Sequence, residues 1–289
     1  MISGSSEKTI AMAENTNVIA ELVIRPRPGW IAVDWAELWH SRELLGFLVW
    51  RDVKVRYKQA VLGILWAVLQ PLFTMIIFTA IFGNFAKVPS DGVPYAAFVF
   101  AGLIPWTFFS NSVTQASQSL INQQSLLTKI YLPRILIPTA SIGGALVDMA
   151  ISFVIFIFIL FYYKITPGWE IFLLPLLLAI TVAATLGIGV ALAAITVTYR
   201  DFRFVVPFMI QSWLYISPVI YPVSVIPKEW HWALALNPMS GLIEAYRSAF
   251  FGLPLDISSL AISTASSLIL LVFGLFYFRK TERRFADIA

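Results

Sequence analysis

Cysteine is absent from this chain, which excludes disulfide bonds, thiolate catalysis and cysteine-ligated metals. Histidine occurs only at His40 and His231, which are too far apart in the sequence to suggest a histidine-based metal centre. The P-loop pattern G-x-x-x-x-G-K-S/T, the zinc motif H-E-x-x-H and the nucleophile motif G-x-S-x-G are also missing. The chain therefore shows no catalytic constellation, and any work on ATP would require a separate nucleotide-binding chain.

Charge is scarce as well, because only 12% of the residues are charged whereas 59% are hydrophobic. A soluble domain usually carries roughly twice that charged fraction. The apolar residues gather in long runs, and about 20 apolar residues in a helix cross the roughly 30 Å core of a bilayer. We predict an all-α integral membrane protein with six transmembrane helices, at about residues 60–82, 95–113, 135–163, 171–198, 204–220 and 258–278.

The basic residues predict an orientation for these helices. With the amino terminus inside, most Lys and Arg residues near the ends of the spans fall on the cytoplasmic side, as the positive-inside rule requires. We expect both termini to be cytoplasmic, with residues 1–33 as a tail, 60–278 as the membrane domain and 279–289 as a basic tail. The net charge of +4 then needs no nucleic-acid partner to explain it.

Residues 34–59, before the first span, are predicted to form an amphipathic helix in the membrane interface. Trp50, Val53 and Tyr57 lie on one helical face, and Arg51, Lys54 and Lys58 lie on another. Asp52 and Arg56 have the i, i+4 spacing of a helical ion pair. Val53, Val55 and Tyr57 also alternate with charged residues as in a strand, but continuity with the next span favours a helix.

Residues 221–256 are apolar yet interrupted by prolines, the last of them Pro254. Such a segment is too broken for a clean span, and we expect short re-entrant or external helices shielded by the rest of the protein. Glu244 and Arg247 lie three positions apart on the outer side. They either pair with each other or line an exit from the membrane.

Asp148 is the only acidic residue well inside a predicted span. It has two interpretations: a relay for protons or cations, or a structural residue near a helix end that pairs with a hydroxyl group. No Lys, Arg or His lies inside a span to partner it, which weakens the case for proton coupling. Gly187 and Gly189, inside an apolar segment, are expected to allow close helix packing.

Two further patterns each allow two interpretations. Aromatic residues in and beside the first, second and fifth spans fit either an interfacial belt or a lining on which sugar rings slide. Two segments on the cytoplasmic side, residues 115–134 and 199–203, are either docking surfaces or solvated turns.

The order of several motifs resembles a known family. The sequence carries, in this order, LGILWAVLQPL (62–72), AGLIPWTFFSNSV (101–113), LLTKIYLPR (126–134), SPVIYP (217–222) and LNPMSGLIEAYR (236–247). The set resembles the membrane subunits of ABC-2 type exporters, in the branch that exports O-antigen, capsule or teichoic acid. No single motif is diagnostic, and the resemblance depends on the ordered set.

The resemblance implies a homodimer that works with two copies of an ABC ATP-binding subunit in the bacterial cytoplasmic (inner) membrane. ATP and Mg²⁺ would be bound by those subunits, and this chain would hold no cofactor. The partners implied are membrane lipids and a lipid-linked glycan, which would cross through a channel at the dimer interface. Alternatives are an ABC-2 exporter of a small drug or peptide, a proton-coupled transporter using Asp148, and a membrane glycosyltransferase.

The resemblance also assigns expected roles to individual residues, none of them catalytic or metal-binding. The substrate channel is expected to include Trp66, Trp106, Phe109, Trp213, Tyr215 and Tyr221. The entrance, where a lipid headgroup would be contacted, is expected to include Arg51, Lys54, Arg56 and Lys58. Coupling to the ATPase is assigned to Gln123, Gln124, Lys129, Arg134, Arg200 and Asp201, and the external gate to Glu244 and Arg247.

Overall fold

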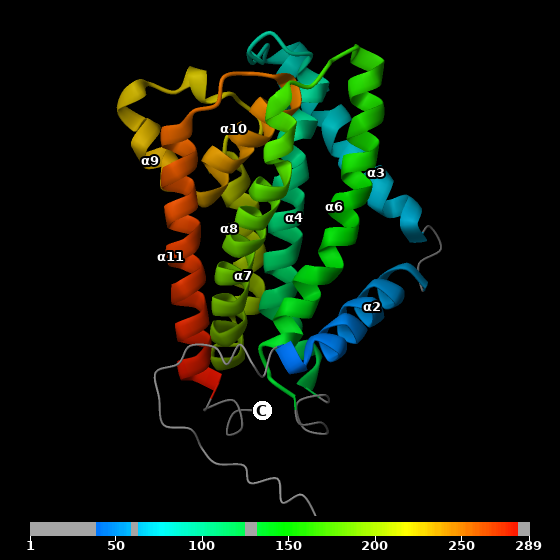
Figure 1. Cartoon of the computed structure of the whole chain (residues 1–289), viewed down its shortest axis with the longest axis vertical. Coiled ribbons are helices and arrows are strands. Elements are labelled where there is room, and N and C mark those ends of the chain that lie inside the picture. The colour runs from blue at the N-terminus through cyan, green and yellow to red at the C-terminus, as the bar shows by residue number, and fades with distance from the viewer. Residues whose placement is uncertain (1–38, 59–62, 125–131, 283–289) are drawn as a thin grey trace, which may run out of the picture. The chain divides into compact units, whose positions relative to one another are not determined.

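The computed structural model describes residues 39–58, 63–124 and 132–282. These residues form helices and connecting turns without a β-strand, which confirms the predicted all-α class (Figure 1). The predicted tail at residues 1–33 and the coupling candidate Lys129 lie outside the described residues.

Five helical segments in the described part of the chain are long and apolar enough to cross a membrane. They are α3 (Gly63–Phe78) continued by a π-helical turn (Thr79–Phe85), α4 (Tyr95–Asn122), α6 (Leu136–Tyr163), α7 (Leu174–Thr198) after a 3-10 turn (Trp169–Leu173), and α11 (Ile257–Glu282). The chain is therefore a multi-pass membrane protein.

The sixth expected span, 204–220, is the short helix α8 (Phe202–Ile216). Its 15 residues extend about 22 Å, which is less than the roughly 30 Å of a bilayer core. The helix ends early because Ser217 precedes Pro218, and a residue before proline avoids the helical conformation. Ser217 is extended, with φ −86° and ψ 144°.

Helix α4 runs well past the expected end of the second span at residue 113. The hydroxyl groups of Thr114, Ser117 and Ser119 each donate a hydrogen bond to a backbone carbonyl one turn earlier in the helix. These polar side chains are thus satisfied within the helix, so the polar composition after residue 113 does not end it.

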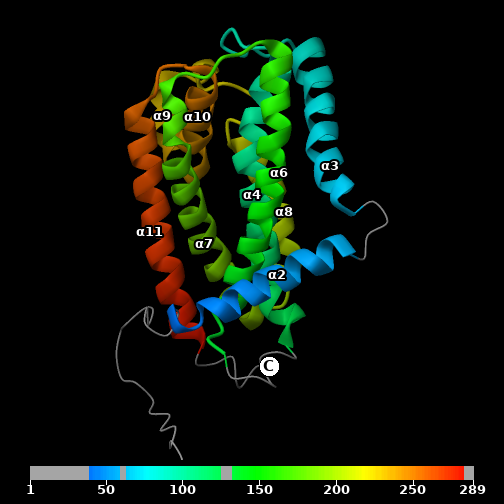
Figure 2. The ribbon, with the colours of Figure 1, turned by 45° about the vertical axis from the view of Figure 1, so that its right-hand side comes forward.

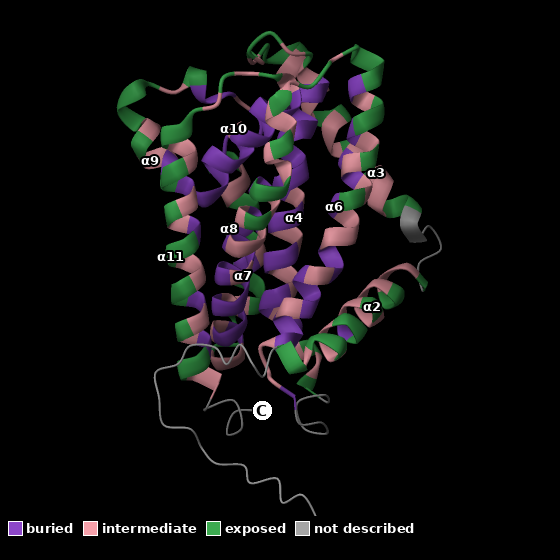
Figure 3. Cartoon of the chain, in the orientation of Figure 1, coloured by how far each residue is buried: buried purple, intermediate pink, exposed green. Residues whose placement is uncertain are grey.

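Helix α4 forms the centre of the bundle, where it packs against α6, α7 and α10. Figure 3 shows α4 mostly buried, whereas α11 has a largely exposed outer face. Little of helix α3 is buried, and apolar side chains such as Phe73 and Ile76 are exposed on it. In a membrane protein such surfaces meet lipid tails or another subunit.

Glycines bring the backbones of α7 and α11 together. A Cβ added at Gly274 would lie 2.0 Å from the carbonyl oxygen of Gly187, and one at Gly187 would lie 2.5 Å from the nitrogen of Leu271. A Cβ at Gly189 would lie 3.1 Å from the Cβ of Ala116 in α4. The prediction that Gly187 and Gly189 serve close helix packing is confirmed.

The proline-interrupted region forms short helices, as predicted. Helix α9 (His231–Ala235) is followed by α10 (Pro238–Phe251), whose first turn is capped by the Asn237 side chain accepting from the Met239 amide. The Gly241 amide donates to the Ser263 hydroxyl in α11, and a Cβ at Gly241 would lie 2.4 Å from the Ser259 carbonyl oxygen. Helix α10 therefore packs directly on the backbone of α11.

Candidate functional site

The amphipathic helix α2 (Arg42–Lys58) lies across one end of α6, which confirms the helical interpretation of this segment (Figures 1 and 2). Leu48 is only 2% exposed and packs with Leu136 and Ala140 of α6. A Cβ at Gly143 would lie 2.7 Å from a methyl group of Val49, so glycine at this position lets the two helices approach. Leu48 and Val49 of α2 thus pack against α6, whereas Trp50, which belongs to the apolar face expected for this helix, is 65% exposed.

The carboxylate of Asp148 in α6 binds two side chains at the C-terminal end of α2. Arg56 forms an ion pair with Asp148 and donates a second hydrogen bond to the Gln115 side chain of α4. The Tyr57 hydroxyl also donates to Asp148, and burial together with this bond raises the pKa of Tyr57, which keeps the phenol protonated. Both side chains of the ion pair are about three-quarters buried.

This arrangement corrects two expectations. Asp148 does have a basic partner, because Arg56 reaches it from a helix outside its span. The expected i, i+4 pair between Asp52 and Arg56 does not form; Asp52 pairs with Arg51 instead, at 2.7 Å. The sequence gives no sign that Tyr57 contacts Asp148, 91 positions away, or that Gln115 contacts Arg56, 59 positions away, so neither Tyr57 nor Gln115 was predicted as a partner in this site.

The four basic residues expected at the entrance divide into two pairs. Arg51 and Arg56 face the rest of the protein. Arg51 also donates a hydrogen bond of 2.7 Å to the side chain of Gln123, the residue that follows α4. Lys54 and Lys58 are exposed on the opposite side of α2, together with Trp50. Only this second pair is open to an anionic headgroup, and that contact stays a prediction.

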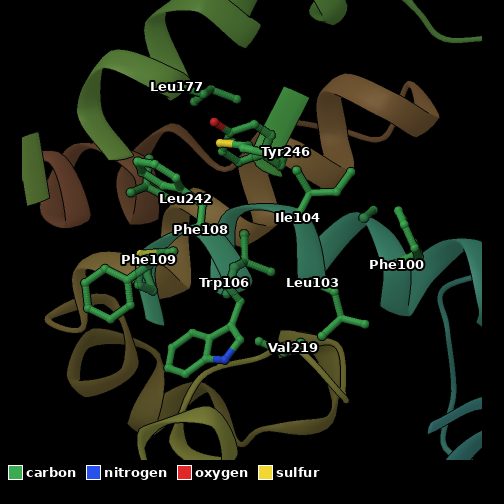
Figure 4. Packing of buried hydrophobic residues seen from close by; sticks show 14 of the residues in the cluster. Phe100, Leu103, Ile104, Trp106, Phe108, Phe109, Leu177, Val219, Leu242 and Tyr246 are labelled. Carbon is green, nitrogen blue, oxygen red and sulfur yellow. The ribbon is translucent and has the colours of Figure 1, made fainter. Parts of the chain in front are cut away.

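The six residues expected to line the channel include both buried and exposed side chains. Trp106 and Phe109 are buried in the hydrophobic core (Figure 4), and Trp213 packs edge-on against Phe109 with ring centroids 5.4 Å apart. Trp66 and Tyr215 are 54% and 60% exposed, while the Tyr221 hydroxyl donates to the carbonyl of Tyr215. Within the chain, Trp106 and Phe109 therefore act as packing residues, whereas Trp66 and Tyr215 reach its surface.

The expected coupling residues in the described part of the chain lie near the same end of the bundle as α2. Gln123 accepts the bond from Arg51, and Arg134 donates to the carbonyl oxygen of Glu282 at the end of α11, at 2.8 Å. Gln124, Arg200 and Asp201 are exposed. The side chains at the two ends of the 123–134 segment are thus tied to α2 and to α11.

Arg247, in α10, is buried and binds the backbone around it. Its guanidinium donates to the carbonyl oxygens of Phe98, Pro218 and Val219 and lies 3.6 Å from the centre of the Phe98 ring. Burial lowers the pKa of Arg247 to about 9. Among the described residues, no ion pair joins Arg247 to Glu244, so the expected i, i+3 pair does not form and Arg247 links α4, α10 and the segment after α8.

Glu244 makes the stability of the protein depend on pH. Burial and the nearby Asp256 carboxylate raise the pKa of Glu244 to about 7, against the weaker opposing effect of Arg247. As pH rises from 4.5 to 7 the unfolded chain loses this proton first, so stability falls across that window by about 1.4 kcal/mol per unit of pKa difference.

We expect the Glu244→Gln variant to keep its stability as pH rises from 4.5 to 7, because glutamine does not ionise. The variant should therefore be more thermally stable than the parent at pH 8 but not at pH 4.5. The measurement is the melting temperature of purified protein in detergent at both pH values. Glu229→Gln, at an exposed carboxylate in the same region, serves as the control. An equal difference between variant and parent at both pH values would contradict the prediction.

Comparisons with known proteins identify the family to which this fold belongs. Residues 43–251 match the family described as ABC-2 type transporter. The O-antigen export system permease protein RfbA of Myxococcus xanthus is 33% identical over 255 residues, which cover 87% of this chain and 97% of that protein. The polysialic acid transport protein KpsM of Escherichia coli is 27% identical over 240 residues, covering 80% and 91%. The chain therefore belongs to the ABC-2 type transporter family.

Proposed function

We propose that this chain is the membrane-spanning permease subunit of an ATP-driven exporter that moves a lipid-linked polysaccharide out across the bacterial cytoplasmic membrane. The observation that carries the proposal is the match to the O-antigen export permease of Myxococcus xanthus, which spans 97% of that protein. A match over nearly the whole relative supports a common transport role. The similarity to a polysialic acid transport protein supports a glycan as the substrate class.

The energy source in this proposal is a separate ATPase. The chain has no P-loop, so two copies of an ABC ATP-binding subunit would hold ATP and Mg²⁺ while this chain holds no cofactor. The exposed residues Gln124, Arg200 and Asp201 would lie in the docking surface for that subunit. Arg134, tied to the end of α11, would transmit movement into the bundle.

The path for the glycan would lie between two copies of the chain. Helices α3 and α8 expose apolar and aromatic side chains, among them Trp66 and Tyr215. Aromatic faces suit the apolar faces of sugar rings, and the indole N–H and phenol groups supply polar contacts. Trp106, Phe109 and Trp213 would support this surface from within the subunit. Lys54 and Lys58 would contact the anionic headgroup at the entrance.

The test of this proposal is export by variants in cells that lack the chromosomal copy. We expect Trp66→Ala to lower glycan export roughly two- to tenfold, the equivalent of one aromatic contact of about 0.5–1.5 kcal/mol. Trp169→Ala, which removes another exposed tryptophan, before α7, is the control and leaves export unchanged. Surface glycan and glycan retained in the cytoplasm are both measured, with protein abundance for normalisation.

Two results would contradict the proposal. One is native purification of the chain without any ATP-binding subunit, combined with export that continues after ATP depletion. The other is normal surface glycan in cells that lack the chain altogether.

A further inference from the structure

We propose that Asp148 is a positioning residue that fixes α2 to α4 and α6, so that these segments move as one body during transport. The proposal rests on the exporter function above, because α2 lies at the end of the bundle where substrate and ATPase would engage. The claim concerns how movement reaches α2, and it assigns Asp148 no contact with the substrate or with a transported proton.

The contact between α2 and α6 is close along its length. Leu48 is buried between the helices, and Val49 occupies the space left by the missing side chain of Gly143. Gly144 faces Asp52 and Val53, each 3.8 Å from the Cβ position. Side chains packed this closely leave no room for α2 to slide along α6.

Polar bonds then fix the rotation of α2. Asp148 accepts from both Arg56 and Tyr57, which are consecutive residues of α2, and bonds that include a charged partner are stronger than neutral ones. A carboxylate on an apolar helix is costly unless it is paired, so the Asp148 carboxylate stabilises α2 only in the position that brings these two groups to it.

Helix α2 is also tied at two separate points, to Gln115 within α4 and to Gln123, the residue that follows α4. Arg56 donates to Gln115, and Arg51 donates to Gln123. Gln115 and Gln123 are about 12 Å apart along a helix, so α2 cannot pivot about either bond without breaking the other. Gln123 also begins the segment assigned to ATPase coupling, so a displacement there would carry α2 with it.

The absence of cysteine allows a direct test. In the double variant Val49→Cys, Gly143→Cys the two Cβ atoms lie 3.7 Å apart, within the usual range for a disulfide. These would be the only cysteines in the chain. We expect the disulfide to form on mild oxidation and the locked protein to export glycan within about twofold of its reduced form. Loss of export on oxidation, with recovery on reduction, would overturn the proposal, because α2 would then have to leave α6.

The role of Asp148 is tested by adding Asp148→Asn to the double-cysteine protein. Without the ion pair, we expect disulfide formation in purified protein to slow by about threefold or more. Tyr57→Phe removes one bond and gives an intermediate rate, which keeps the test available if Asp148→Asn folds poorly. Glu43→Gln removes an exposed carboxylate from the same helix and is the matched control. An unchanged rate with Asp148→Asn would refute a positioning role.

Export and ATP hydrolysis provide the functional readout. We expect Asp148→Asn to lower the amount of glycan exported per ATP hydrolysed. The disulfide between the cysteines introduced at positions 49 and 143 should restore it, because it holds α2 on α6 in place of the lost ion pair. If Asp148 contacted the substrate or carried a proton, the disulfide would not restore the amount of glycan exported per ATP hydrolysed. That result would overturn the proposal. The disulfide rates are measured without substrate or ATPase, so they test the role of Asp148 even if glycan export itself is not observed.

Discussion

Replacing Arg247 with alanine is expected to prevent the accumulation of folded protein. The guanidinium is buried and donates to three carbonyl oxygens, those of Phe98, Pro218 and Val219. Leaving a buried carbonyl without its donor costs about 1–3 kcal/mol. The Pro218 and Val219 carbonyls belong to the segment after α8, so their combined loss is large against a total stability of about 5–15 kcal/mol.

The measurement is the yield of monodisperse protein after extraction in detergent, followed by its melting temperature. We expect Arg247→Lys to recover only part of the loss, because an ammonium group cannot reproduce the planar arrangement of donors. Arg279→Ala breaks an exposed ion pair with Glu282 and should change the melting temperature little. A normal yield and melting temperature for Arg247→Ala would contradict the structural role assigned here.

Replacing Gly274 with alanine is expected to separate α7 from α11. The new Cβ would lie 2.0 Å from the carbonyl oxygen of Gly187, and that oxygen belongs to a helix backbone that cannot rotate away. Relief therefore requires the two helices to move apart along their whole contact. Overpacking of this kind costs about 1–3 kcal/mol and sometimes more, and leucine at the same position should be worse than alanine.

Gly46 provides a matched control for Gly274. A Cβ at Gly46 would have no atom within 4 Å, and alanine favours a helix over glycine by about 1 kcal/mol. We therefore expect Gly46→Ala to keep or raise the melting temperature in detergent, whereas Gly274→Ala lowers it and reduces the yield. Equal behaviour of the two variants would show that α7 and α11 separate without cost.

The sequence predicted the elements of the fold better than their ends. The apolar runs indicated the membrane-crossing helices, because a bilayer leaves the backbone no alternative to internal hydrogen bonding. The predicted ends of two helices were wrong, because local chemistry decides where each of them stops. Pro218 shortens α8, and hydroxyl groups bonded back to the helix carry α4 to Asn122.

The sequence could not predict which way the expected site residues face, because residue type does not reveal the direction of a side chain. Trp106 and Trp66 are both tryptophans within apolar segments, yet one is 4% exposed and the other 54%. The basic residues of α2 differ in the same way, with Arg56 turned toward Asp148 and Lys58 toward the outside. Helical spacing placed Arg51, Lys54 and Lys58 on one face, whereas in the structure Arg51 binds Gln123 and the two lysines are exposed.

By itself, the sequence determined that this is a helical membrane protein and which family it belongs to. Those depend on composition and on short-range order, since apolar length, glycine spacing and the order of motifs are all readable along the chain. Only the tertiary structure decided that Arg56, Tyr57 and Gln115 meet at Asp148 and that Arg247 binds carbonyl groups. All of these contacts join residues far apart in the chain, and those at Asp148 exist because packing at Gly143 and Gly144 brings α2 onto α6.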